Sequence, residues 1–133
     1  MKCFIDSNVI ISAGLFPDSV PAAAIAKAIA PPNTAFVSDY SLDEMHRVIN
    51  EKFPNKVSDL ETFLYRTLFT VQLLVTPTDN SEEELKISDV NDRPIIRAAL
   101  EADIDVLITG DKVLLNSGVE KLQIISPADF LKI

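Results

Sequence analysis

The sequence is poor in the residues on which several common kinds of site depend. Its 133 residues include one cysteine and three glycines. The single cysteine, Cys3, has no partner for a disulfide within the chain, which suits a reducing compartment. With so few glycines, the sequence contains no Gly-rich loop of the kind that cradles phosphate groups. Disulfide scaffolds and nucleotide-binding loops are therefore excluded.

Histidine is equally scarce, because His46 is the only one in the chain. A nucleophilic triad built on histidine would have to use this residue, and no Gly-x-Ser-x-Gly turn accompanies it. The sequence therefore gives no support to a hydrolase of the serine-histidine type.

Long hydrophobic runs are also missing. No apolar stretch approaches the roughly 20 residues that a membrane-spanning helix needs. The first apolar stretch begins directly after Met1, without the basic segment and cleavage site of a secretory signal. We therefore expect a cytoplasmic protein without a membrane segment. A length of 133 residues with 47% hydrophobic residues fits one domain over residues 1–133.

Positive charge is in deficit, with 12 basic against 20 acidic residues and a net charge of −8. Such a balance argues against a passive nucleic-acid binder, which normally carries a basic stripe. An enzyme that loads an acidic site with metal ions escapes part of this objection. Much of the negative charge lies in residues 78–84, which we expect to form a solvated loop or helix start.

Short apolar runs alternate with helical patterns along the chain. Strands are predicted at 2–5, 35–37, 71–75, 106–108 and 122–125. Helices are predicted at 8–13, 21–30, 42–52, 58–69, 94–102, 112–115 and 127–131. Strands separated by helices predict a three-layer α/β/α sandwich with a mostly parallel central sheet.

Four short stretches place a carboxylate where an apolar run ends or a helix begins: 4–8, 41–44, 89–93 and 108–112. In an open parallel sheet, ligands gather beyond the carboxyl ends of the strands. Carboxylates that meet there stay ionised only if cations neutralise them. The pattern therefore indicates a site for Mg²⁺ or Mn²⁺ and phosphoryl-transfer chemistry.

Helical geometry distinguishes the two carboxylates of the second stretch. Glu44 lies about 40° from Val48, at the border of the apolar stripe, whereas Asp43 lies farther out. We therefore prefer Glu44 as the inward carboxylate.

Each carboxylate also has an explanation that involves no ligand. Ser41 and Glu44 have the spacing of a capping box, and Asp92 and Asp111 are suitable helix N-caps. Asp6 interrupts an apolar strand with no evident cap geometry, and a buried carboxylate needs hydrogen bonds, a cation or protonation. Asn8 and Thr109 are candidates to donate those hydrogen bonds. Capping treats the four sites as independent, whereas one metal pocket explains them together.

The four stretches, in this order and spacing, resemble the motifs of the PIN domains, metal-dependent nucleases that include the VapC-like toxins of toxin-antitoxin systems. The first is a strand followed by Asp6-Ser7-Asn8, and the second ends at Glu44. The third is Asp89-Val90-Asn91-Asp92-Arg93, and the fourth is Ile108-Thr109-Gly110-Asp111. The closing 125–131 segment is typical of one toxin branch. The resemblance covers nearly the whole chain.

The resemblance implies hydrolysis of RNA phosphodiester bonds with Mg²⁺ or Mn²⁺. It assigns the metal ions to four carboxylates, those of Asp6, Glu44, Asp92 and Asp111. Asn8 and Thr109 would orient these ligands from behind. Asp89 competes with Asp92 for one role, and we favour Asp92 because the helix follows it directly.

The resemblance also implies partners. An antitoxin protein would cover the acidic edge, and a homodimer is expected from the family. Candidates for gripping the RNA backbone are the four basic residues nearest the motifs, which are Arg47, Arg93, Arg97 and Lys112. Ordinary surface charge explains each of them equally well.

Two other functions remain open from the sequence. A phosphatase of the haloacid-dehalogenase type also begins with a strand that ends in aspartate, but its motif has a second aspartate where this chain has Asn8. A PIN-like domain without catalysis, acting only through protein partners, is the other. Acidic residues at all four motif positions argue against it.

Overall fold

Five short strands form one sheet in the computed structural model, which describes residues 1–133. They are β1 (Lys2–Ile5), β2 (Thr34–Ser38), β3 (Gln72–Leu74), β4 (Val106–Ile108) and β5 (Gln123–Ile125). The order across the sheet is β3-β2-β1-β4-β5, and every neighbouring pair is parallel. The chain builds outward from β1 to one edge, then crosses back to start again at β4. The topological switch point therefore lies between β1 and β4, at the centre of the sheet.

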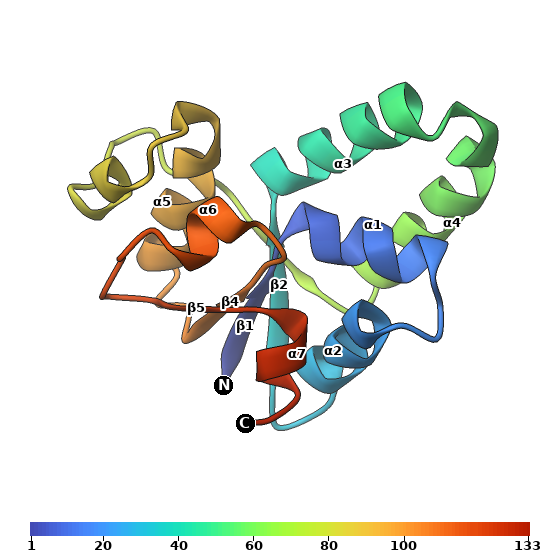
Figure 1. Cartoon of the computed structure of the whole chain (residues 1–133), viewed down its shortest axis with the longest axis horizontal. Coiled ribbons are helices and arrows are strands. Elements are labelled where there is room, and N and C mark those ends of the chain that lie inside the picture. The colour runs from blue at the N-terminus through green and yellow to red at the C-terminus, as the bar shows by residue number, and fades with distance from the viewer.

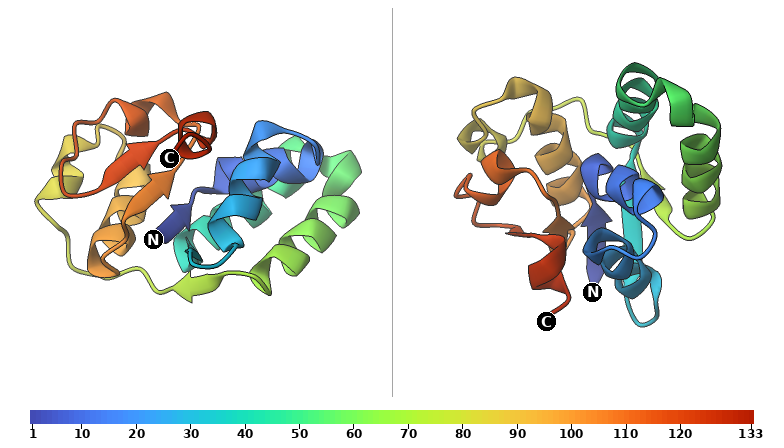
Figure 2. Two further views of the ribbon diagram at one scale, coloured as in Figure 1. Left: turned by 90° about the horizontal axis from the view of Figure 1, so that it is seen from below. Right: turned by 45° about the vertical axis from the view of Figure 1, so that its right-hand side comes forward.

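Helices cover both faces of the sheet (Figures 1 and 2). They are α1 (Ser7–Leu15), α2 (Val20–Ile29), α3 (Asp39–Lys52), α4 (Val57–Leu68), α5 (Arg93–Glu101), α6 (Lys112–Leu115) and α7 (Pro127–Phe130). Single 3-10 turns lie at η1 (Pro54–Lys56), η2 (Glu83–Lys86) and η3 (Val90–Asp92). No single helix is long and apolar enough to cross a membrane; α1 and α2 reach that length and composition together but are bent by 117° at the break between them.

Two hydrophobic cores lie on opposite faces of the sheet. Side chains alternate between the faces along each strand. In β1, for example, Cys3 and Ile5 enter one core, and Phe4 enters the other. The first core is packed by α1, α2, α3, α4 and α7, and the second by α5 and α6. This arrangement confirms the predicted α/β/α sandwich and explains why the central strands read as continuous apolar runs.

The start of α3 differs from the prediction. The helix begins at Asp39, three residues earlier than expected, because the Ser38 hydroxyl accepts a hydrogen bond from the Ser41 backbone N–H at 3.0 Å. Ser38 is therefore the N-cap. The proposed capping box of Ser41 and Glu44 is wrong, and the Glu44 carboxylate is not used to close the helix.

The acidic run at 78–84 also differs from the prediction at one residue. The Glu84 side chain is 2% exposed and forms an ion pair with Arg97, with Nη2 to Oε1 at 2.8 Å and Nε to Oε2 at 3.0 Å. Arg97 also donates to the Pro77 carbonyl at 3.1 Å and to Asn80 Oδ1 at 2.8 Å. The run is therefore not merely a solvated loop, because its last residue ties the loop to α5.

Candidate active site

Asp6 is the innermost carboxylate of the site. It follows the last residue of β1, is 3% exposed, and its Oδ1 accepts the Ser7 backbone N–H at 2.8 Å. Asp6 is thus the N-cap of α1, and the expectation that it lacks cap geometry is wrong. Its other oxygen, Oδ2, accepts hydrogen bonds from Thr109 at 2.7 Å and Asn8 at 3.1 Å. The two predicted donors are therefore confirmed as its partners.

These partners connect the ends of two adjacent strands. The backbone N–H of Asp6 donates to the Ile108 carbonyl of β4 at 3.0 Å. Asn8 Oδ1 accepts the Gly110 N–H at 3.0 Å, from the loop that follows β4. Thr109 is fully buried, and its hydroxyl also accepts the Asp111 N–H at 3.0 Å. Strands β1 and β4 therefore present Asp6 and Asp111 side by side at the switch point.

Asp111 acts as a helix cap as well as a site residue. It is half-buried, and its Oδ1 accepts the Val113 N–H at 2.8 Å at the start of α6. The capping explanation holds for this residue. Asp111 also lies beside Asp6 at the carboxyl edge of the sheet. The same residue therefore caps α6 and belongs to the acidic cluster.

Glu44 approaches the site from α3. It is half-buried, whereas its neighbour Asp43 is exposed, as helical geometry predicted. The Ser7 hydroxyl lies near the Glu44 carboxylate and favours its ionised form. Burial raises the pKa of Glu44, and the charge of Asp92 raises it further, while the Ser7 hydroxyl and the charge of Arg47 lower it.

Asp92 completes the group at the start of α5. It occupies the N-cap position, but its side chain makes no capping hydrogen bond, so the capping explanation fails here. Asp89 is exposed, and its Oδ1 accepts the Asn91 N–H at 2.9 Å. The free, half-buried carboxylate of Asp92 favours it over Asp89 as a ligand.

The carboxylates of the site raise one another's pKa values. The pKa of Asp6 is raised to about 6, first by burial and then by the charges of Glu44 and Asp111, against the opposing hydrogen bonds of Thr109 and Ser7. The pKa of Asp92 is also raised to about 6, by burial and by Asp111, Asp89 and Asp6. The fold thus places at least three carboxylates close together, and only a proton or a bound cation reduces the repulsion between their negative charges.

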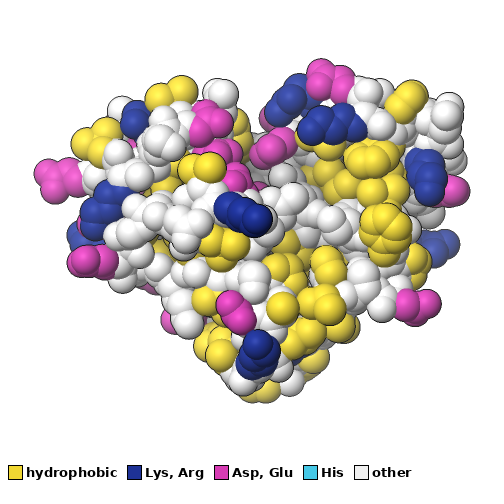
Figure 3. All heavy atoms as spheres, in the orientation of Figure 1, with side chains coloured by type: hydrophobic (Ala, Val, Ile, Leu, Met, Phe, Trp, Pro, Cys, Tyr) yellow, Lys and Arg dark blue, Asp and Glu magenta, His cyan; other side chains and the backbone are white.

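An open cleft of about 490 Å³ lies on the α3 side of this cluster. Its lining is almost wholly polar and consists of Tyr40, Glu44, Arg47, Asp89, Asn91 and Asp92. Figure 3 shows acidic side chains gathered in the hollow between the α3 side and the α5–α6 side of the molecule. Basic side chains flank the hollow on the α3 side.

The donor set fits a hard divalent cation. All four side chains offer carboxylate oxygens, which are the ligands that Mg²⁺ and Mn²⁺ prefer. Burial and the neighbouring carboxylates raise the pKa values of Asp6 and Asp92. In the side-chain positions described, no three of the His, Cys, Asp and Glu side chains have the geometry of a metal site. The carboxylates are therefore neighbours rather than a closed coordination shell.

The four basic candidates lie in different environments. Arg47 and Lys112 are exposed, and Arg47 makes a loose ion pair with Glu51 at 3.8 Å. Arg93 is half-buried and donates its Nε–H to the Ile87 carbonyl at 3.0 Å. Arg97 is bound within the Glu84 ion pair, so its guanidinium holds the fold together and is not free to grip RNA.

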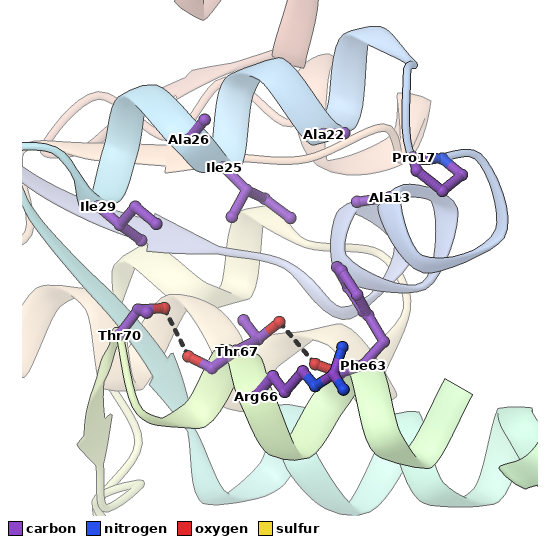
Figure 4. A pocket seen from close by; sticks show the side chains of 10 residues that line it. All are labelled: Ala13, Pro17, Ala22, Ile25, Ala26, Ile29, Phe63, Arg66, Thr67 and Thr70. Carbon is purple, nitrogen blue, oxygen red and sulfur yellow. Dashed lines mark hydrogen bonds between the residues drawn. The ribbon is translucent and has the colours of Figure 1, made fainter. Parts of the chain in front are cut away.

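A second pocket, of about 280 Å³, has a different character. It lies among α1, α2 and α4, and its ten lining residues include none of the carboxylates (Figure 4). Ile25, Ile29 and Phe63 line it with apolar surface. This pocket is separate from the acidic cleft in both position and chemistry.

Sequence reasoning missed two residues that line the cleft, Tyr40 and Asn91. Tyr40 lies one helical turn before Glu44, on the same face of α3. Because the helix was predicted to begin at residue 42, Tyr40 was left outside it. The signal that would have identified Tyr40 is the serine at 38, which caps a helix that includes residues 39 and 40.

Comparison with known proteins places these observations in a family. A family model described as a PIN domain matches residues 2–113. Among solved structures, the chain is similar to one in VapBC2 from Rickettsia felis, bound to a DNA fragment from the promoter, with a TM-score of 0.74. Identity is 13%, over 95% of this chain and 98% of the other. No protein in a search of curated sequences matches the chain.

Two further structures show the same fold. VapC20 from Mycobacterium tuberculosis, described as a toxin that cleaves the sarcin-ricin loop, aligns with a TM-score of 0.64 and 12% identity. The match covers 90% of this chain and 98% of that one. PAE2754 from Pyrobaculum aerophilum aligns with a TM-score of 0.67 and 14% identity, over 99% of this chain and 94% of that one.

Proposed function

The chain belongs to the PIN domain family, and from that premise we propose that it is a metal-dependent ribonuclease that hydrolyses RNA phosphodiester bonds. The observation that carries the proposal is the convergence of four carboxylates, from β1, α3, the start of α5 and the loop after β4, at the carboxyl edge of the sheet. The pKa values of Asp6 and Asp92 reach about 6 because burial and neighbouring carboxylates oppose their ionisation. A group of acids gathered at one edge of the sheet is suited to hold cations.

The proposed ligands are Asp6, Glu44, Asp92 and Asp111, with Mg²⁺ or Mn²⁺ as the ion. When bound, such an ion activates water for attack on the phosphate and stabilises the negative charge that develops there. The four carboxylates bind and orient the ions.

The remaining polar groups fix these ligands in place. Thr109 and Asn8 hold Asp6 Oδ2 by hydrogen bonds, and the Ser7 hydroxyl lies near Glu44. Such support limits the movement of a ligand and sets which of its oxygens is free. Asp89, exposed at the rim of the cleft, adds negative charge beside Asp92.

RNA backbone contacts are assigned to the basic residues around the cleft. Arg47 lines the cleft, Lys112 is exposed at the start of α6, and Arg93 begins α5. A chain with a net charge of −8 repels RNA over most of its surface, so local cations next to the site would direct the phosphate to it.

A role as the toxin of a toxin-antitoxin pair is the more specific part of the proposal. It is supported by the similarity in fold to VapBC2 and to VapC20, the latter described as a cleaving toxin. An antitoxin would cover the acidic edge and place a basic side chain among the carboxylates. A homodimer and a cytoplasmic location belong to the same proposal.

The first experiment is titration of Mn²⁺ into the purified protein by calorimetry. We expect saturable binding that is lost in Asp6→Asn and in Asp92→Asn. Asp43→Asn is the matched control, because Asp43 is an exposed acid on the same helix as Glu44 and should leave binding unchanged. Absence of binding to the wild-type protein would favour the domain without catalysis.

The second experiment measures RNA cleavage in the presence of Mn²⁺. Asp6→Asn should lower the rate by at least 100-fold, on the order expected when a ligand charge is removed from a metal-dependent site. Its circular dichroism spectrum should remain that of the wild-type protein. A folded Asp6→Asn variant with full activity would overturn the assignment.

A haloacid-dehalogenase phosphatase is not supported by the geometry around Asp6. In that class the second position after the aspartate carries an acid that transfers protons. Here the position is Asn8, whose amide is bonded to Asp6 and Gly110. Membership of the PIN family agrees with this difference.

A further inference from the structure

Polar contacts attach the segment that carries Asp92 to the rest of the molecule at several points, including Arg93 Nε to the Ile87 carbonyl at 3.0 Å and Lys86 Nζ to the Gly118 carbonyl at 3.4 Å. Residues 75–92 leave β3 and reach α5 with only two short 3-10 turns. At the start of the segment, Asp39 Oδ1 accepts the Thr76 N–H at 3.0 Å and the Thr76 hydroxyl at 2.6 Å. In the middle of the segment, Glu84 forms an ion pair with Arg97 of α5.

A further attachment is made by Tyr40, next to Asp39 in the first turn of α3. The Tyr40 hydroxyl donates a hydrogen bond to the Asn91 backbone carbonyl, one residue before Asp92. Its ring is half-buried and packs against the core on the α5 side of the sheet. The core thus holds the ring in place, and the hydroxyl bonds to the backbone of η3 at Asn91.

Tyr40 also stands one turn before Glu44 on the same helix face. Both side chains line the cleft together with Asn91 and Asp92. Glu44 moves with α3, whereas Asp92 belongs to a separate segment. The bond from Tyr40 to Asn91 therefore joins the two sides of the cleft directly beside their carboxylates.

We propose that Tyr40 is a positioning residue whose hydroxyl, through the Asn91 carbonyl, fixes Asp92 relative to Glu44 so that the two carboxylates share a metal ion. The inference rests on the proposed function, because it assigns a purpose to a residue of the same site. The hydroxyl acts on the backbone of the ligand segment and does not itself contact the ion.

The test compares Tyr40→Phe with Tyr65→Phe. The chain has two tyrosines, and Tyr65 is a matched control because its ring is 65% exposed on α4, in edge-to-face contact with Phe69. Each variant loses one hydroxyl and keeps its ring. Mn²⁺ binding is measured by calorimetry, and amide hydrogen exchange is measured on the metal-free proteins.

For Tyr40→Phe we expect Mn²⁺ binding to weaken by about five-fold, the effect of losing one hydrogen bond that organises a ligand. Amide exchange at residues 90–93 should speed up by a similar factor, with the rest of the chain unchanged. Tyr65→Phe should match the wild-type protein in both measurements. A purely structural role would instead speed exchange widely and leave the Mn²⁺ affinity of the folded protein unaltered.

The result that would overturn the inference is wild-type Mn²⁺ affinity in Tyr40→Phe, while Asp92→Asn abolishes binding. Equal losses in Tyr65→Phe would also overturn it. If the wild-type protein binds no Mn²⁺, both the metal-dependent function and the role of Tyr40 toward the metal are overturned. Failure of Tyr40 alone thus leaves the proposed function standing.

Discussion

Two influences on the Asp6 carboxyl oppose each other: hydrogen bonds that favour its ionised form and burial that disfavours it. One oxygen caps α1 through the Ser7 N–H, and the other accepts hydrogen bonds from Thr109 and Asn8. Hydrogen bonds of this kind lower a carboxyl pKa, yet the pKa of Asp6 is raised to about 6 because burial outweighs them. The Asp6 carboxylate therefore accepts the hydrogen bonds of an ionised group, but its burial disfavours the negative charge.

This conflict predicts how stability depends on pH in the absence of metal. A raised native pKa means that the protonated acids stabilise the fold fully below their unfolded pKa of about 3.9 and that this stability is lost as the pH rises through about 6. Between pH 5 and 7.5, Asp6 alone should cost about 1 kcal/mol of unfolding free energy. Urea denaturation in EDTA measures the change.

Two variants sharpen that measurement. Asp6→Asn should show a weaker dependence on pH over this interval, and Asp43→Asn should follow the wild-type curve. The Glu84 carboxyl, whose pKa is lowered mainly by its hydrogen bonds to Arg97, loses its stabilising charge at lower pH and stays outside this interval. An unfolding free energy that is constant from pH 5 to 7.5 would contradict the assigned burial of Asp6.

At the scale of elements, the pattern of apolar runs predicted the strands and helices well. Strands 2–5 and 106–108 begin and end as predicted, because both are short runs buried on two faces. The placement of Asp6 and Asp111 at the carboxyl edge followed from these strands alone. The local sequence pattern is enough to predict a residue's position when its surroundings are determined by its own strand or helix.

The errors arose where a side chain bonds to its own helix end or to a distant segment. The start of α3 depends on the Ser38 cap, and the environment of Arg97 depends on Glu84, thirteen residues away along an irregular loop. Tyr40 was missed for the same reason, since its partner Asn91 is 51 positions later. Such pairings leave no periodic signal in the sequence.

The corrected start of α3 gives a prediction that distinguishes the Ser38 N-cap from a capping box of Ser41 and Glu44. Ser38→Ala should lower the free energy of unfolding by about 1 kcal/mol, the usual value of a serine N-cap. Glu44→Ala should cause no loss at pH 7.5 without metal, because it removes a half-buried charge that repels Asp92. Thermal unfolding followed by circular dichroism measures both. A loss of stability in Glu44→Ala would contradict the stated repulsion between Glu44 and Asp92.

For the molecule as a whole, the strand order concentrates charge at the centre of the sheet. The switch point between β1 and β4 lies beneath Asp6 and Asp111, and α3 and α5 bring Glu44 and Asp92 to it from either side. The same cluster that disfavours the metal-free protein should be neutralised by a bound ion. Binding and folding are therefore coupled.

This coupling predicts that Mn²⁺ raises the unfolding temperature. At a concentration 100 times its dissociation constant, a ligand that binds only the folded state adds about 2.7 kcal/mol, or about 10 °C for a chain of this size. Differential scanning calorimetry with and without EDTA measures the shift. Asp92→Asn should abolish the shift, and Asp43→Asn should keep it. An equal shift in Asp92→Asn would place the ion elsewhere.

The bond between Thr109 and Asp6 spans 103 positions of the chain. During synthesis, a ribosome produces Asp6, Glu44 and Asp92 before it produces β4. Until then Asp6 lacks both Thr109 and the neighbouring strand, so an incomplete chain carries the acids without the site. The topology of the sheet therefore delays assembly of the acidic site until the last third of the protein has emerged.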